Sequence, residues 1–176
     1  GAQLAAQQDS SIKAIVALSP WLETPSTALN NSTSILFISG ELDNVAPNDY
    51  HTNVFYNNTP ETTDKLLYEI SGGDHYTVVS PYNDLEMGLK TVFWLEKYIL
   101  NNLSNCDSLI IQPSTASDFS TNIECPSNIT GDITQDGSIN FLDLLLLISW
   151  VLNISTPSDL EMSIADVTND SVLDIF

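Results

Sequence analysis

The sequence predicts an α/β fold, in which a mostly parallel sheet is covered by helices on both of its faces. Three observations support this prediction. Short, nearly continuous apolar runs alternate with segments of helical character, which is typical of parallel strands buried on both faces. Each apolar run ends at a proline or a glycine. Aromatic, acidic and histidine residues follow the runs directly, where the sites of open α/β sheets lie.

The elements are predicted one by one from these patterns. Each strand is a run rich in Ile, Leu, Val and Phe, and the longest helix has an apolar face at three- and four-residue spacing. Asp84 and Glu86 near its start and Lys97 near its end suit the helix dipole. In chain order we expect a helix at 2–8, strands at 12–19 and 34–39, a helix at 49–57, a strand at 65–70, a helix at 84–101 with Leu85, Leu89, Val92, Phe93 and Ile99 on one face, and a helix at 142–152.

The composition excludes several classes of partner. The 176 residues include 4 Lys+Arg, all lysine, against 23 Asp+Glu, for a formal charge of −19. Nucleic acids and anionic membrane surfaces both require clustered basic residues, so neither is an expected partner. Hydrophobic residues make up 43%, which suits a packed core. No apolar run reaches the roughly 20 residues of a membrane helix, and no signal peptide is visible at the N-terminus.

The chain changes character near residue 126. Residues 1–126 carry 15 acidic residues and all 4 lysines, whereas residues 131–176 carry 8 acidic residues and no basic one. The Cys-Pro-Ser-Asn segment from Cys125 onwards has the composition of a boundary. We therefore predict a first domain at 1–126, a linker at 127–130 and a second module at 131–176.

Three side chains after successive strands suggest a catalytic site. Trp21 follows the first strand, Asp43 the second and His75 the third. A carboxylate that orients an imidazole is two thirds of a nucleophilic triad, and Asp before His is the order found in α/β hydrolases. The competing residues are His51, which lies inside a predicted helix, and the carboxylates of Glu41 and Asp74, of which Asp74 is expected to point away from the histidine.

The two cysteines leave two interpretations open. Cys106 and Cys125 enclose a segment rich in Ser, Thr and Asn, and their spacing matches no zinc pattern. They form either a disulfide that closes a surface loop or two free thiols. The polar, lysine-poor composition suits a secreted protein, in which a disulfide would persist.

Four segments, in order, resemble the bacterial cutinases and polyester hydrolases, including the poly(ethylene terephthalate) (PET) hydrolases. They are 14–21 (Ala-Ile-Val-Ala-Leu-Ser-Pro-Trp), 40–47 (Gly-Glu-Leu-Asp-Asn-Val-Ala-Pro), 51–65 and 72–76 (Gly-Gly-Asp-His-Tyr). The resemblance covers residues 1–126 and implies the C-terminal half of an α/β-hydrolase fold. It implies Asp43 as the acid and His75 as the base of the triad. It also implies a substrate cleft with Trp21, Val45 and Tyr76, no cofactor for catalysis, and a disulfide between Cys106 and Cys125.

Two departures from that family bear on function. The nucleophile motif Gly-His-Ser-Met-Gly-Gly is missing, and so is the loop that supplies the other oxyanion donor; the first residues align just after that motif. The chain is therefore expected to be a fragment whose serine lies upstream. Residues 76–80 (Tyr-Thr-Val-Val-Ser) also differ from the family's usual type, which leaves open short-chain esters, cutin-like polyesters and synthetic polyesters.

The acidic module contains a calcium-loop pattern. Counting from Asp132, oxygen-bearing residues fall at the loop's ligand positions and Gly137 falls at the sharp turn. Aspartate at position 12, where the EF-hand has glutamate, resembles the dockerin type I repeat, which implies Ca²⁺ and a cohesin-like protein partner. The predicted ligands are Asp132, Thr134, Asp136, the Ser138 carbonyl, Asn140 and Asp143. A second, weaker copy starts 34 residues later with Asp166, Thr168, Asp170 and Asp174, with Ser171 in place of the glycine and no position 12.

These features together predict a secreted serine esterase of the cutinase or polyester hydrolase type with a dockerin-like module, through which it could attach to a cell surface. One alternative is another α/β-hydrolase esterase, of the dienelactone-hydrolase or lipase type. A second alternative, from another class, is a catalytically dead fragment that assembles in a calcium-dependent way.

Overall fold

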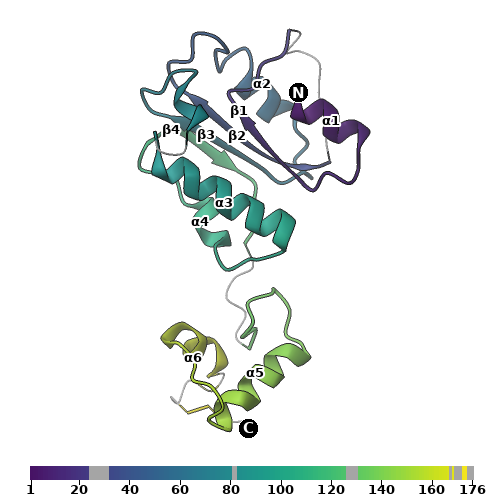
Figure 1. The fold of residues 1–176 in the computed structure, drawn as a ribbon, viewed down its shortest axis with the longest axis vertical. Helices are drawn as coiled ribbons and strands as arrows, with labels where there is room; N and C mark the ends of the chain where they lie inside the picture. Colours follow the sequence, from purple (N-terminus) through teal and green to yellow (C-terminus); the bar gives the residue numbers. More distant parts are fainter. Residues whose placement is uncertain (24–31, 81–82, 126–130, 167, 169–171, 174–176) are drawn as a thin grey trace. The chain divides into compact units, whose positions relative to one another are not determined.

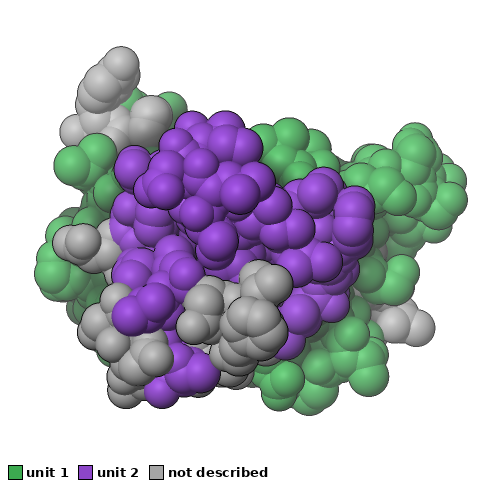
Figure 2. Space-filling model, turned by 90° about the horizontal axis from the view of Figure 1, so that it is seen from below, with its two compact units in different colours: residues 1–101, 105–124 green, residues 102–104, 125–176 purple. Residues whose placement is uncertain are grey.

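The computed structural model of the chain describes residues 1–23, 32–80, 83–125, 131–166, 168 and 172–173 (Figure 1). They form two compact units, which Figure 2 colours separately: residues 1–101 with 105–124, and residues 102–104 with 125–176. Each unit is described here by itself.

The first unit is built on a four-stranded sheet in the order β1-β2-β3-β4. β1 (Ala14–Leu18), β2 (Ser34–Gly40) and β3 (Lys65–Ile70) are parallel, and β4 (Ala116–Thr121) pairs with β3 in the antiparallel direction. The three parallel strands therefore end at one edge of the sheet, which is where the candidate catalytic loops begin.

Helices cover both faces of this sheet (Figure 1). α1 (Ala2–Gln8) and α2 (Thr52–Asn58) pack on one face, where Ala6 and Phe55 join strand residues such as Phe37 in one apolar cluster. α3 (Leu85–Leu100) lies on the opposite face with the short α4 (Cys106–Ile110), and a 3₁₀ turn spans Thr77–Val79. The predicted α/β class with a mostly parallel, doubly covered sheet is confirmed.

The segment between the cysteines is not the plain surface loop that we predicted. It contains α4 and β4, and β4 extends the sheet beyond β3. The run Ala-Ser-Asp-Phe-Ser-Thr escaped prediction because β4 is largely solvent-accessible and carries polar residues at most positions.

The apolar stripe predicted on the longest helix is not its buried face. In α3 the buried residues are Met87, Lys90 and Trp94, whereas the predicted stripe residues Leu85, Leu89, Val92 and Ile99 are exposed in this unit. Trp94 is fully buried, and its ring centroid lies 4.5 Å from that of Tyr98, so large aromatic side chains occupy the buried side of α3.

Two of the four lysines are buried at the ends of helices. Lys65 Nζ donates to the carbonyls of Tyr56 and Thr59 at the end of α2, 3.3 and 2.8 Å away, and pairs with Glu61 at 2.6 Å. Lys90 Nζ donates to the carbonyls of Ser108, Leu109 and Ile111 around the end of α4. A cation at a helix C-terminus satisfies carbonyls that have no partner within the helix.

Replacing Lys90 with methionine is expected to lower the free energy of unfolding by about 2–3 kcal/mol, because buried carbonyls would lose their donor. Lys97→Met is the matched control on the same helix: the Lys97 ammonium stands over the Tyr98 ring at 5.4 Å, an interaction worth about 0.5–1 kcal/mol at accessible sites. Urea unfolding of the complete protein measures both. Equal losses would show that the carbonyls around Lys90 do not depend on it.

The second unit contains α5 (Phe141–Val151) and α6 (Asp159–Ala165). Both helices begin with a capping box, in which Asn140 pairs with Asp143 and Ser158 with Glu161. Its small core consists of Ile133, Trp150 and Ala165 with three partly buried leucines. None of the helices described in either unit combines the length and the apolar character needed to cross a membrane.

Candidate functional site

Asp43 and His75 form a hydrogen-bonded pair at the carboxyl edge of the sheet. His75 Nδ1 lies 2.8 Å from Asp43 Oδ2, and the Asp43 side chain is fully buried whereas 26% of the His75 side chain is exposed. A buried carboxylate that holds Nδ1 leaves the other ring nitrogen, Nε2, as the one free to exchange protons. The two residues lie 32 positions apart in the chain, so the sheet itself brings them together.

Two glycines allow the loops after β2 and β3 to run side by side. A Cβ atom at Gly40 would lie 2.4 Å from the carbonyl oxygen of Gly73, so no other residue fits there without moving the backbone. The Leu42 amide donates to that same carbonyl at 2.7 Å, and the Glu41 amide donates to Ile70 at 2.9 Å. This close approach places Asp43 next to His75.

The surroundings of Asp43 keep its carboxylate ionised. Burial raises its pKa, but hydrogen bonds from the Ala46 amide, His75 and the Val45 amide, with a smaller contribution from the nearby Ser19 hydroxyl, outweigh burial, so the pKa lies below the ordinary value. The Ala46 and Val45 amides donate to Asp43 Oδ1 at 2.7 and 2.9 Å, which leaves Oδ2 to the imidazole. The carboxylate is thus charged and fixed in orientation at neutral pH.

The competing residues have other partners. Glu41 accepts hydrogen bonds from the Gly72 amide at 2.7 Å and from Ser71, so it ties the two loops together. Asp74 accepts from the amides of Tyr76 and Thr77, both at 3.0 Å, at the start of the 3₁₀ turn. Both carboxylates therefore hold their own loops in place, whereas Asp43 holds the His75 ring.

His51 is buried at the start of α2 rather than inside that helix. Its ring lies 6.0 Å from the ring of Trp21 and 6.3 Å from that of Phe55. The sequence predicts His51 inside a helix and does not indicate its contact with Trp21, because the two residues are 30 positions apart and belong to different elements.

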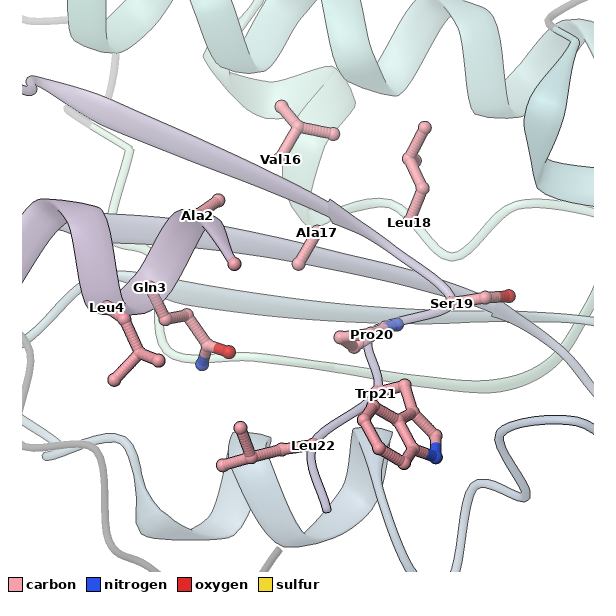
Figure 3. Close-up of a pocket in the computed structure, with 11 residues that line it drawn as sticks. Ala2, Gln3, Leu4, Val16, Ala17, Leu18, Ser19, Pro20, Trp21 and Leu22 are labelled. Carbon is pink, nitrogen blue, oxygen red and sulfur yellow. The ribbon is translucent and has the colours of Figure 1, made fainter. Parts of the chain in front are cut away.

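The predicted cleft residues are largely exposed at this edge. Trp21, Val45 and Tyr76 come from three different loops and have exposed fractions of 58%, 55% and 65%. The Tyr76 ring stands edge-on to the His75 ring at 5.5 Å. Trp21 also borders a cavity of about 240 Å³ between α1 and β1, with Gln3, Leu4 and Ala17 among its lining residues (Figure 3).

The calcium-loop residues lie together in the second unit, where they hydrogen-bond to the loop itself. Asp132 accepts from the Gly137 amide at 2.8 Å and the Asp136 amide at 3.1 Å, and Asp143 accepts from the Thr134 and Asn140 amides at 2.8 and 2.7 Å. Asp136 accepts from the Ser138 amide and from the Asn140 side chain. All six predicted ligands therefore belong to one compact loop.

Within the residues that the structure describes, no three His, Cys, Asp or Glu side chains are arranged as a metal site. Ionised carboxylates only accept hydrogen bonds, and Asp132 and Asp143 accept theirs from backbone amides of the loop. Two observations nevertheless fit a hard cation: Asp132 and Asp143 are buried without a basic partner, and Gly137, at φ 86°, makes the predicted sharp turn. In the second loop, Asp170 and Asp174 lie outside the described residues.

Burial also raises the pKa of Asp143, but hydrogen bonds from Thr134 and Asn140 outweigh it, and the pKa lies below the ordinary value. The carboxylate is therefore ionised at neutral pH, as a calcium ligand must be.

Cys106 and Cys125, the only two cysteines of the chain, are disulfide-bonded. This confirms the first of the two interpretations of the cysteines.

The comparisons with known proteins agree with this arrangement. Residues 1–126 match the PET hydrolase-like family, and residues 130–175 match the dockerin type I domain. Cutinase est1 of Thermobifida alba is 30% identical over 94 residues, which are 53% of this chain and 31% of that protein. The chain thus spans about a third of the length of this curated relative. From these matches, the chain belongs to the PET hydrolase-like family over residues 1–126 and continues as a dockerin type I domain over residues 130–175.

Proposed function

We propose that this chain is part of a secreted serine carboxylic-ester hydrolase of the cutinase or polyester hydrolase type. The observation that carries the proposal is the 2.8 Å bond between the buried, ionised Asp43 and the partly exposed His75. Membership of the PET hydrolase-like family supports the same activity. Because the match to the cutinase covers 31% of its length, we place the nucleophilic serine in a segment outside these 176 residues.

In this mechanism His75 is the general base and Asp43 orients it. As the serine oxygen bonds to the acyl carbon, His75 Nε2 takes the serine proton, and Asp43 stabilises the resulting imidazolium. The imidazolium then gives that proton to the departing alcohol. His75 then takes a proton from a water molecule that attacks the acyl-enzyme. It returns this proton to the serine oxygen as the acyl–serine bond breaks, so that the carboxylic acid leaves and the free serine is restored.

The test is hydrolysis of a p-nitrophenyl ester by the complete protein with and without His75. Activity that disappears with the imidazole supports the triad. Activity that survives would contradict it, and a wild-type protein without any esterase activity would favour the catalytically dead, calcium-dependent assembly fragment.

Trp21 is proposed to bind the substrate's aromatic ring. More than half of its side chain is exposed, and His51 lies against it, which leaves a flat apolar surface at the rim of the site. We expect Trp21→Ala to lower turnover of an aromatic polyester about 3–10-fold, since an offset aromatic pair adds about 0.5–1.5 kcal/mol beyond area burial. Turnover of a short aliphatic ester should change less.

Val45→Ala serves as the matched control for that prediction, because Val45 is equally exposed but has no ring. Release of soluble aromatic acid from polyester film is measured beside hydrolysis of p-nitrophenyl butyrate. An equal loss on both substrates would argue against ring binding by Trp21 and for a general disturbance of the site.

For the dockerin type I domain we propose calcium binding and a cohesin-like protein partner. The ligands would be the side chains of Asp132, Thr134, Asp136, Asn140 and Asp143 and the carbonyl of Ser138. On α5, Phe141, Leu145 and Ile148 are exposed within their unit, and such an apolar helix surface favours a protein partner. Attachment through this domain would hold the enzyme outside the cell and near insoluble substrate. The disulfide of the chain suits such an oxidising environment.

A further inference from the structure

Ser19 has three unusual properties at the carboxyl end of β1. Its φ angle is 38°, in the left-handed region that non-glycine residues rarely adopt. It is buried, with an exposed fraction of 6%. Its hydroxyl oxygen is buried as well and has no hydrogen-bond partner of good geometry among the described residues. Strained backbone and unpaired buried polar groups both concentrate at functional sites.

The position of Ser19 in the sheet brings it to the Asp43 loop. β1 pairs with β2 in parallel, with Leu18 opposite Ile38, and the Ser19 amide continues the ladder by donating to the Ile38 carbonyl at 2.7 Å. Ser19 thus lies level with the last residues of β2, just before the loop that carries Asp43. Its side chain points away from α1 (Figure 3).

The hydroxyl already acts on the Asp43 carboxylate. It is one of the groups that hold the Asp43 pKa below its ordinary value, after the Ala46 amide, His75 and the Val45 amide. A hydrogen bond to that carboxylate would satisfy the unpaired buried hydroxyl.

We propose that Ser19 is a positioning residue, whose hydroxyl donates a hydrogen bond to the Asp43 carboxylate and thereby fixes that carboxylate against His75. This inference rests on the proposed function. Two amides and the imidazole hold Asp43 from its own loop and from the loop after β3, and Ser19 adds a contact from the loop after β1. All three parallel strands would then contribute to the orientation of the base.

The test compares Ser19→Ala with Ser39→Ala in the complete protein. Ser39 is a matched control, because it is a fully buried serine on the neighbouring strand, its hydroxyl is also unpaired, and it is not among the groups that shift Asp43. We expect Ser19→Ala to lower kcat by about 5–10-fold with little change in KM, since the orientation of the base matters in the chemical step. Ser39→Ala should stay within twofold of the wild type.

Two further readouts separate positioning from general destabilisation. Without the hydroxyl, the Asp43 charge acts more strongly on the imidazolium, so the acid limb of the kcat/KM profile should move to higher pH. The proton resonance of His75 Nδ1 in the nuclear magnetic resonance spectrum should move too, and neither should change in Ser39→Ala. If Ser19→Ala does not fold, Ser19→Gly removes the same hydroxyl and adopts φ 38° without strain.

Wild-type kcat, pH profile and Nδ1 resonance in the Ser19 variant would overturn the inference. That result leaves the proposed function intact as long as His75→Ala is inactive. Conversely, an active His75→Ala variant would remove the proposed function itself, whatever Ser19 does.

Discussion

Replacing His75 with alanine in the complete protein is expected to lower kcat for p-nitrophenyl butyrate by about four orders of magnitude or more. The Asp43–His75 pair is the only arrangement among the described residues in which a buried carboxylate holds a partly exposed imidazole. Without the imidazole, a serine nucleophile would have no acceptor for its proton. KM should change little, because the imidazole contributes to the chemical step rather than to substrate binding.

His51→Ala is the natural control for this experiment, because His51 is the other histidine of the chain. His51 contacts the rings of Trp21 and Phe55, whereas the Asp43 carboxylate pairs with His75. We expect this variant to keep most of its kcat and to show its effect in KM. Comparable losses of kcat in the two variants would mean that His75 has no special role.

Calcium is expected to produce the second large effect, a stabilisation of residues 131–176. Asp132 and Asp143 are buried in a module that contains 8 carboxylates and no basic residue, so their mutual repulsion opposes folding. A bound cation would replace this repulsion by attraction and couple binding to folding. At 100 times the dissociation constant, bound Ca²⁺ would stabilise the module by about 2.7 kcal/mol.

Asp136→Ala should weaken calcium binding by at least tenfold, because it removes a charged ligand next to the turn at Gly137. Asp118→Ala is a suitable control, since this carboxylate lies on β4 in the other unit. Isothermal titration and calorimetric unfolding of the complete protein, with Mg²⁺ alongside Ca²⁺, measure the effect. No heat and no shift in unfolding at millimolar Ca²⁺ would exclude a calcium-binding loop.

The apolar runs and their end signals were sufficient to predict the parallel strands. β3 spans the predicted residues 65–70, β1 is two residues shorter at its start and one at its end than predicted, and β2 is one residue longer at its end. Buried parallel strands are long apolar runs, so composition alone marks them. β4 has no such signal, because its position depends on pairing with β3, a contact that is not local in sequence.

The candidate site shows the same division between local and non-local information. Asp43 and His75 could be predicted because each follows a strand and stands near a glycine. The contact of His51 with Trp21 and the burial of Ser19 depend on how separate loops fold over one another, which no local pattern encodes. The turn at Gly137 could be predicted from the spacing of the residues around it, whereas the hydrogen bonds from loop amides to Asp132 and Asp143 depend on how the loop folds.

The burial of Lys65 and Lys90 has a practical consequence for handling the protein. Of the four lysines, only Lys13 and Lys97 remain accessible to reagents, against 23 acidic residues. Coupling to amine-reactive beads would therefore use few positions, whereas carbodiimide activation of surface carboxylates would use many. Because acidic residues outnumber basic ones by 23 to 4, this chain should adsorb poorly to negatively charged plastics at neutral pH. Adsorption should improve as the pH approaches about 4.1, where the sequence carries no net charge.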